Sequence, residues 1–249
     1  MNVEHLFDIF TSVDANSKNV WHACAGFTNH LAWHKPRLVV LGPKIEALPD
    51  DHPSKAQCLH WLAWLFELVG NQVERKRLFT HTLKLWRPRG DRYQIAQTLL
   101  ELCDTNRLVG LPEEGIQQAK EASGIFERLG DTVKQAESLI EPARLLYSDE
   151  QFDAIEEAAS RAINLLPEKG KQLNVCQGHH ALGYIYYSKG EGEKAIHHLG
   201  LALRIASSLN YYTELFWVHF ALADLFLGHG RFADAPGALR CTRPTMYTF

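Results

Sequence analysis

The chain has 249 residues, of which 46% are hydrophobic and 22% are charged, with a formal net charge of −3. These values are ordinary for a globular protein. They exclude the strongly positive electrostatic field that attracts nucleic acids and anionic membranes, so we expect neither as a partner. The five cysteines are odd in number and never occur as Cys-x-x-Cys, which argues against a disulfide framework or a thiolate zinc site. This favours a reducing compartment, the cytosol or the nucleus, and of the two we expect a cytoplasmic location.

Residues 1–52 are predicted to form a divergent helical segment followed by a connector. "VEHLFDIF" and "NVWHACAGFTNHLAWH" have helical spacing of apolar residues, whereas "KPRLVVLGPKIEALPDDHP" is interrupted by prolines and is expected to be irregular. The N-terminus lacks the basic start and unbroken apolar run of a secretory signal. No stretch of the chain approaches the roughly 20 apolar residues that a membrane span needs.

Residues 53–235 repeat with a period of 40. Three sets of positions share this spacing: Gly90, Gly130, Gly170 and Asn210; the small residues Ala63, Cys103, Ala143, Gly183 and Ala223; and Ala56, Ala96, Ala136 and Cys176. A fixed period of this length indicates a solenoid, in which each unit buries its apolar face against its neighbours.

Each repeat is predicted to contain two helices. In "QLNVCQGHHALGYIYYSKG" and "EKAIHHLGLALRIASSL" the apolar residues follow steps of three and four. Between these segments, Gly190 can end one helix in the left-handed conformation, and Glu191 and Glu193 place negative charge at the start of the next helix. We therefore interpret the Gly-x-Gly here as a helix turn and not as a phosphate-binding loop.

The stretch "ALGYIYYSKGEGEKAIHHLGLAL" resembles a tetratricopeptide repeat. Leu182, Gly183 and Tyr186 match the first helix of that repeat, and Ala195, Leu199 and Ala202 match the second. The resemblance covers residues 53–235 and implies an all-α, right-handed superhelical solenoid of about five antiparallel helix pairs. It also implies a concave face, lined by the first helices, that binds a protein or peptide partner.

Two other segments, "LAWHKPRLVVLGPKIEALPDDHPSKAQCL" and "KRLFTHTLKLWRPRGDRYQIAQTL", resemble the C-terminal repeat arrays of basidiomycete-fungal NOD-like proteins. In that family the repeats follow a P-loop NTPase module of NACHT or NB-ARC type. Here the Gly-x-x-x-x-G spacing occurs at Gly110–Gly115, followed by Ile-Gln where a P-loop has Lys-Ser/Thr. A regulatory fragment without its nucleotide-binding module is therefore an alternative function.

A metal-dependent enzyme is a weaker alternative. The thirteen histidines include His179-His180, His197-His198 and the pair His30 and His34, but no H-E-x-x-H or convergent ligand set completes a zinc site. No nucleophile motif such as G-x-S-x-G occurs. We expect no catalytic residue, metal or cofactor.

We call a set of positions that recur 40 residues apart a column. The predicted binding residues are those whose columns lie on the inner face of the first helices. They combine amides, charges and aromatic rings, which suit recognition of an extended peptide or a partner helix. The candidates are Gln57, His60, Trp64, Gln97, Asp104, Arg107, Glu137, Arg144, Tyr147, Gln177, His180, Tyr184, Tyr187, Trp217 and Asp224.

Prolines mark two departures from the repeat. Pro142 falls within the predicted first helix of the third unit, where we expect a kink. The pattern stops after Ala235, so residues 236–249 are predicted to be a disordered tail. We expect apolar surface at Phe220, Leu225, Phe226 and Phe232 to be incompletely covered, which favours self-association and the interpretation of the chain as a truncated repeat array.

Overall fold

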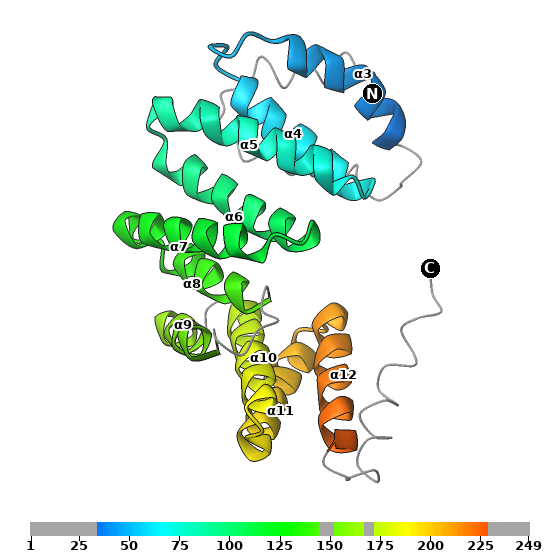
Figure 1. Ribbon diagram of the computed structural model, residues 1–249, viewed down its shortest axis with the longest axis vertical. Helices are drawn as coiled ribbons and strands as arrows, with labels where there is room; N and C mark the ends of the chain where they lie inside the picture. The colour runs from blue at the N-terminus through cyan, green and yellow to red at the C-terminus, as the bar shows by residue number, and fades with distance from the viewer. Residues whose placement is uncertain (1–33, 145–151, 167–171, 229–249) are drawn as a thin grey trace. The chain divides into compact units, whose positions relative to one another are not determined.

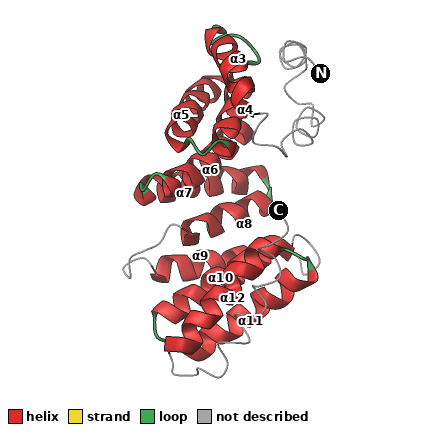
Figure 2. Cartoon of the chain, turned by 90° about the vertical axis from the view of Figure 1, so that its right-hand side faces the viewer, coloured by secondary structure: helices red, strands yellow, loops and turns green. Residues whose placement is uncertain are grey.

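The computed structural model describes residues 34–144, 152–166 and 172–228, and Figure 1 follows the chain through them. The α-helices are α3 (His34–Ala47), α4 (Lys55–Leu68), α5 (Gln72–Arg89), α6 (Arg92–Leu108), α7 (Pro112–Leu129), α8 (Thr132–Ile140), α9 (Phe152–Leu165), α10 (Gln172–Ser188), α11 (Gly192–Ser208) and α12 (Tyr212–Gly228). A short 3-10 helix, η2 (Glu141–Arg144), follows α8. Within these ranges there is no strand, and Figure 2 shows only helices and short loops. The predicted all-α class is confirmed.

The corners between helices repeat one local structure. Gly90 ends α5 at a φ of 70°, and its backbone N–H donates to the carbonyls of Trp86 and Arg87. The side chain of Asp91 then accepts a hydrogen bond of 3.1 Å from the backbone N–H of Gln94, which caps α6. The same left-handed backbone occurs at Gly70, Gly110, Gly130, Gly190 and Asn210. These positions lie 20 residues apart, or a multiple of 20, so in the described parts of the chain the corner recurs at half the 40-residue period.

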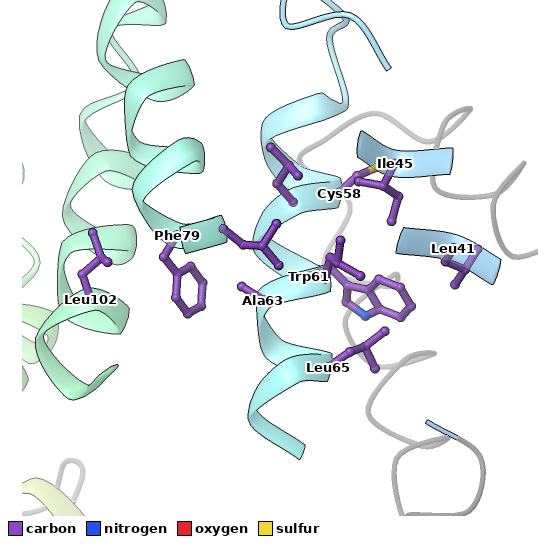
Figure 3. Packing of buried hydrophobic residues seen from close by; sticks show 11 residues of the cluster. Leu41, Ile45, Cys58, Trp61, Ala63, Leu65, Phe79 and Leu102 are labelled. Carbon is purple, nitrogen blue, oxygen red and sulfur yellow. The ribbon is translucent and has the colours of Figure 1, made fainter. Parts of the chain in front are cut away.

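The chain divides into two compact units, residues 1–125 and 126–249. In the first unit, α4 packs against α5 and α5 packs against α6. Figure 3 shows the core of this unit, in which Trp61 and Leu65 of α4 lie between α3 and the side chains of α5 and α6.

One prediction for this unit is wrong. Residues 35–47 are predicted to belong to an irregular connector, but they form nearly all of α3, which packs on α4. Leu41 and Ile45, four residues apart, are 1% and 2% exposed and anchor the helix in the core. Pro43 lies inside α3, so the loss of one helical hydrogen bond is outweighed by the burial of this apolar face.

The second unit contains α8 to α12, in which α10 packs on α9, α11 and α12. Gly183 of α10 faces Leu199 of α11 so closely that a Cβ at residue 183 would lie 2.6 Å from Leu199 Cγ. The predicted columns of small residues are confirmed as buried contacts at Ala56, Ala63, Ala96, Cys103, Ala136, Cys176, Gly183 and Ala223.

The structure differs from the expected kink at Pro142. Helix α8 has 9 residues, whereas α10 and α12, at the same place in their repeats, each have 17. The α-helix ends at Ile140 and the chain continues as the 3-10 helix η2. Pro142 has no N–H to donate to the carbonyl four residues earlier, so the i to i−4 ladder stops here.

The end of the repeat array lies partly outside the described residues, as do Phe232, the predicted tail and residues 1–33. Of the apolar residues expected at the surface, Phe220 is 56% exposed, but Leu225 is fully buried in the core around α11 and α12, which corrects that expectation. Self-association and the array boundaries remain predictions. Among the helices that are described, none combines the length and the hydropathy that a membrane crossing requires.

Candidate functional site

Two helices of the second unit bring predicted site residues together. On α10, Gln177, His180, Tyr184 and Tyr187 follow steps of three and four and share one helix face, and on α12 Glu214, Trp217, Phe220 and Asp224 do the same. We call these eight residues the α10–α12 face. His180 Nδ1 lies 2.6 Å from Glu214 Oε1, and the Tyr187 hydroxyl donates a hydrogen bond to Asp224. These two contacts hold the four residues of α10 beside the four residues of α12.

Aromatic rings dominate the exposed part of this face. Trp217 is 51% exposed, Phe220 is 56% exposed and Tyr184 is 43% exposed. The Trp217 ring packs edge-on against Phe216 and Phe220, with centroid distances of 5.1 and 6.4 Å. Large rings that remain in contact with water retain hydrophobic free energy that a partner can gain on binding.

Among the described residues, the carboxylates of the face contact a histidine and a tyrosine and not a lysine or arginine. Glu214 contacts the His180 ring, and Asp224 accepts from the Tyr187 hydroxyl. The hydrogen bond to Asp224 raises the pKa of Tyr187, with burial as a second cause. Since the Asp224 side chain is exposed, its negative charge is available to a partner.

The predicted residues of the first unit lie in a different environment. Arg75 of α5 is 2% exposed and contacts Glu67 of α4 at 3.1 Å, and Glu101 and Asp104 of α6 at 3.1 and 3.0 Å. Arg107 contacts the other oxygen of Asp104 at 2.6 Å. Asp104 and Arg107 are therefore committed to an ion network within the fold.

Burial sets the protonation of this network. Burial raises the pKa of Glu101 to about 7, although the Arg75 guanidinium opposes the shift. Burial also opposes ionisation of Asp104, but the hydrogen bonds from Arg107 and Arg75 outweigh it and hold the pKa of Asp104 below its usual value. The three carboxyls share two guanidinium groups, and Glu101 is the one that most readily takes a proton.

The remaining candidates of the first unit are mostly packed. His60 was predicted to line the binding surface, but its side chain is 2% exposed and its ring packs edge-on against Phe79 at 5.0 Å. That prediction is wrong because the His60 position turns toward α5. Trp64 is half-buried against the core, and Gln57 and Gln97 are also half-buried.

The candidate residues of the third repeat contribute little to a described binding surface. Glu137 of α8 pairs with Lys134 one turn earlier, at 2.9 Å. The side chain of Arg144 and all of Tyr147 lie outside the described residues. Their assignment to the binding surface therefore remains a prediction.

Histidines cluster between α10 and α11 without forming a metal centre. His179 Nδ1 lies 3.0 Å from His198 Nδ1, and the His198 ring stacks on Tyr186. Burial, reinforced by the neighbouring histidines, lowers the pKa of His179 to about 4. In the described ranges, no three His, Cys, Asp or Glu side chains converge as metal ligands.

The column pattern did not predict two residues that make key contacts, Arg75 and Glu214. Arg75 lies on a second helix, whereas the candidate columns were drawn along first helices. Glu214 lies one helical turn before Trp217 and faces His180 of the preceding repeat. Glu214 follows His180 by 34 residues and not by the 40-residue period, so the repeat spacing held no signal for this contact.

Comparisons with known proteins support the repeat fold. No model of a protein family matches the chain. The chain is 27% identical to Protein KINESIN LIGHT CHAIN-RELATED 3 of Arabidopsis thaliana over an alignment of 148 residues, which covers 55% of this chain and 22% of that protein. It thus spans about a fifth of the length of this curated relative.

Solved structures resemble the chain over most of its length. A putative kinesin light chain from Podosopora anserina with nearly identical TPR-like repeats superposes with a TM-score of 0.62 and 16% identity, covering 76% of this chain and 95% of that one. A Rap protein complexed with competence and sporulation factor has a TM-score of 0.72 and 10% identity, covering 96% and 74%. The chain therefore has a tetratricopeptide-like fold of repeated helix pairs.

A third structure bears on the NTPase resemblance. It is a Signal Transduction ATPase with Numerous Domains protein with a tetratricopeptide repeat sensor from Pyrococcus horikoshii. Its TM-score is 0.56 at 15% identity, and the match covers 95% of this chain but 41% of that one. At this identity the likeness shows the fold alone.

Proposed function

We propose that the chain is a non-catalytic scaffold that binds an extended peptide or a partner helix, and that the α10–α12 face is its contact surface. The observation that carries the proposal is the exposure of Tyr184, Trp217 and Phe220 together on this face. Aromatic anchors of this kind supply most of the affinity at protein interfaces. The Rap structure, solved in complex with a factor, supports the use of such a fold for recognition.

A stable scaffold around the face supports the same proposal. The ring-bearing helices are held by a buried core that includes Cys176, Leu199, Val218 and Leu225, and His180 and Glu214 fix their register. Fixed anchors lose little side-chain freedom when a partner binds. We also propose a cytoplasmic location, which the buried thiols of Cys58 and Cys176, neither of which forms a disulfide, support.

The proposal is tested with a random library of 12-residue peptides displayed on phage and selected on the full chain. We expect the selected peptides to bind the Tyr184→Ala/Trp217→Ala double variant about tenfold or more weakly, because two anchors are removed. Tyr93→Ala is the matched control, since Tyr93 is an exposed aromatic of α6 at 43%. Equal loss in the control, or no loss in the double variant, contradicts the proposal.

A second candidate is a sensor segment of a P-loop NTPase. It is favoured by the likeness to the repeat-bearing ATPase from Pyrococcus horikoshii. In this role the chain would still bind its signal through the repeats, while a separate module would bind the nucleotide. A thermal shift of this chain with ATP and Mg²⁺ would contradict that division, and we expect none.

A further inference from the structure

The charge of the α10–α12 face points to the chemistry of its partner. Residues 172–188 and 212–228 contain no lysine and no arginine, while α12 carries Glu214 and Asp224. Asp224 is exposed and is hydrogen-bonded to the Tyr187 hydroxyl, which leaves its charge in place. A partner with positive charge gains attraction here, and an acidic partner is repelled.

The aromatic rings lie between the two carboxylates along α12. Trp217 follows Glu214 by three residues, and Phe220 precedes Asp224 by four. The faces of such rings attract cations, and a nearby carboxylate adds to the attraction. The chain already makes this contact elsewhere, since Lys194 Nζ lies 5.0 Å from the centroid of the Tyr186 ring.

We propose that the α10–α12 face selects a peptide segment that carries lysine or arginine, with the cation placed between the Trp217 and Phe220 rings and the Asp224 carboxylate. This inference rests on the proposed function and specifies its partner. A purely apolar segment would cover Asp224 without pairing it, and burying an unpaired carboxylate is costly. A basic side chain covers the rings with its methylene groups and pairs the carboxylate with its head group.

The spacing of the face limits the sequence of the segment. Trp217 and Asp224 are seven residues apart on α12, a rise of about 10 Å. An extended peptide advances roughly 3.3 Å per residue, so about three of its residues span this distance. The face therefore selects an apolar or aromatic residue and a lysine or arginine that lie about three positions apart.

The test uses the peptides selected from the same 12-residue library. We expect lysine and arginine to be enriched over the unselected library, and replacement of the basic residue by glutamine to weaken binding about tenfold. Raising NaCl from about 50 to 500 mM should remove most of that preference, because salt screens exposed charges. Asp224→Asn keeps the hydrogen-bond acceptor for Tyr187 and should reduce the preference for lysine over glutamine at least threefold, roughly 0.6 kcal/mol.

The control is Glu193→Gln, which removes the same charge from an exposed site at the start of α11. If Glu193→Gln lowers the preference as much as Asp224→Asn does, the effect is one of net charge and the inference is overturned. If selected peptides lack basic residues but still lose affinity on Trp217→Ala, the scaffold function stands and this inference fails. If no library peptide of any charge binds the chain, both proposals fail.

Discussion

Asp104 and Asp224 occupy the same column of the repeat, 120 residues apart, and they have opposite roles. In the first unit, Asp104 is held by Arg75 at 3.0 Å and by Arg107 at 2.6 Å. In the second unit, Asp224 is exposed and accepts from the Tyr187 hydroxyl. Equivalent positions of one repeat are therefore tied into the fold in one place and left exposed in another, where we propose that Asp224 serves recognition.

The difference arises from the neighbouring helix. The guanidinium of Arg75 on α5 lies against the first helices α4 and α6 and forms ion pairs with Glu67, Glu101 and Asp104. Asp224 lies 120 residues after Asp104, and the residue 120 positions after Arg75 is Ala195, so no guanidinium is available at the position equivalent to Arg75. The arginine converts the face of the first unit into an internal ion network.

The largest expected effect on stability comes from removing that arginine. Arg75→Met should lower the free energy of unfolding by about 3 kcal/mol, because three carboxyls lose a shared guanidinium and remain close together. The control is Arg77→Met on the same helix, whose side chain is 46% exposed and pairs with Glu46 and Glu74. An exposed pair contributes under about 1 kcal/mol, and urea denaturation separates the two cases. Equal losses of unfolding free energy in the two variants would contradict the ion network around Arg75.

The sensitive point of the second unit is steric. Gly183→Ala should cost about 2 kcal/mol, because its Cβ would lie 2.6 Å from Leu199 Cγ and 3.2 Å from the Leu199 backbone nitrogen. Gly200→Ala on α11 is the control, since no heavy atom lies within 4 Å of a Cβ there. We expect that substitution to be neutral or slightly stabilising, as measured by thermal unfolding. A stable Gly183→Ala protein would show that α10 and α11 pack less closely.

A smaller, pH-dependent effect is expected at Glu101. Its pKa is raised from 4.5 to about 7 in the folded chain, so folding takes up a proton between these values and the free energy of unfolding falls as pH rises through this window. Glu101→Gln cannot lose the proton. The stability of this variant relative to the native chain should increase by on the order of 1–2 kcal/mol between pH 5 and 7.5. If denaturation curves showed the same difference in free energy of unfolding between the variant and the native chain at both pH values, they would contradict the raised pKa of Glu101.

The smallest stability effect is expected at Asp224. Asp224→Asn should change the free energy of unfolding by under about 0.5 kcal/mol, because the side chain is exposed and the amide oxygen still accepts from Tyr187. Asp104→Asn, at the equivalent position, should cost about 1–3 kcal/mol through its lost arginine contacts. Equal costs at the two sites would remove the distinction between the two units.

The repeat period predicted the packing better than it predicted the surface. A column of small residues follows directly from helices that approach closely in every unit, as Ala63 and Gly183 show. The columns could not show which residues of a second helix reach across to a first helix, so they did not predict that Arg75 engages Asp104.

The predicted connector and the position of His60 were also predicted less well. The prolines of residues 35–53 obscured α3, because Leu41 and Ile45 gain from burial only once α4 is in place. His60 fitted the inner column by number, but its ring packs against Phe79 of the second helix. Tertiary contacts of this kind have no counterpart in the spacing of one sequence.

Site-directed photo-crosslinking tests the central claim most directly. The photoreactive residue p-benzoylphenylalanine is placed at Phe220 on the α10–α12 face or at Tyr93 on α6, two aromatic positions that are 56% and 43% exposed. A library-selected peptide is added to each protein before irradiation. We predict a crosslinked product with the probe at position 220 and none at position 93, with competition by unlabelled peptide. Crosslinking at position 93 and not at position 220 would contradict recognition through the α10–α12 face.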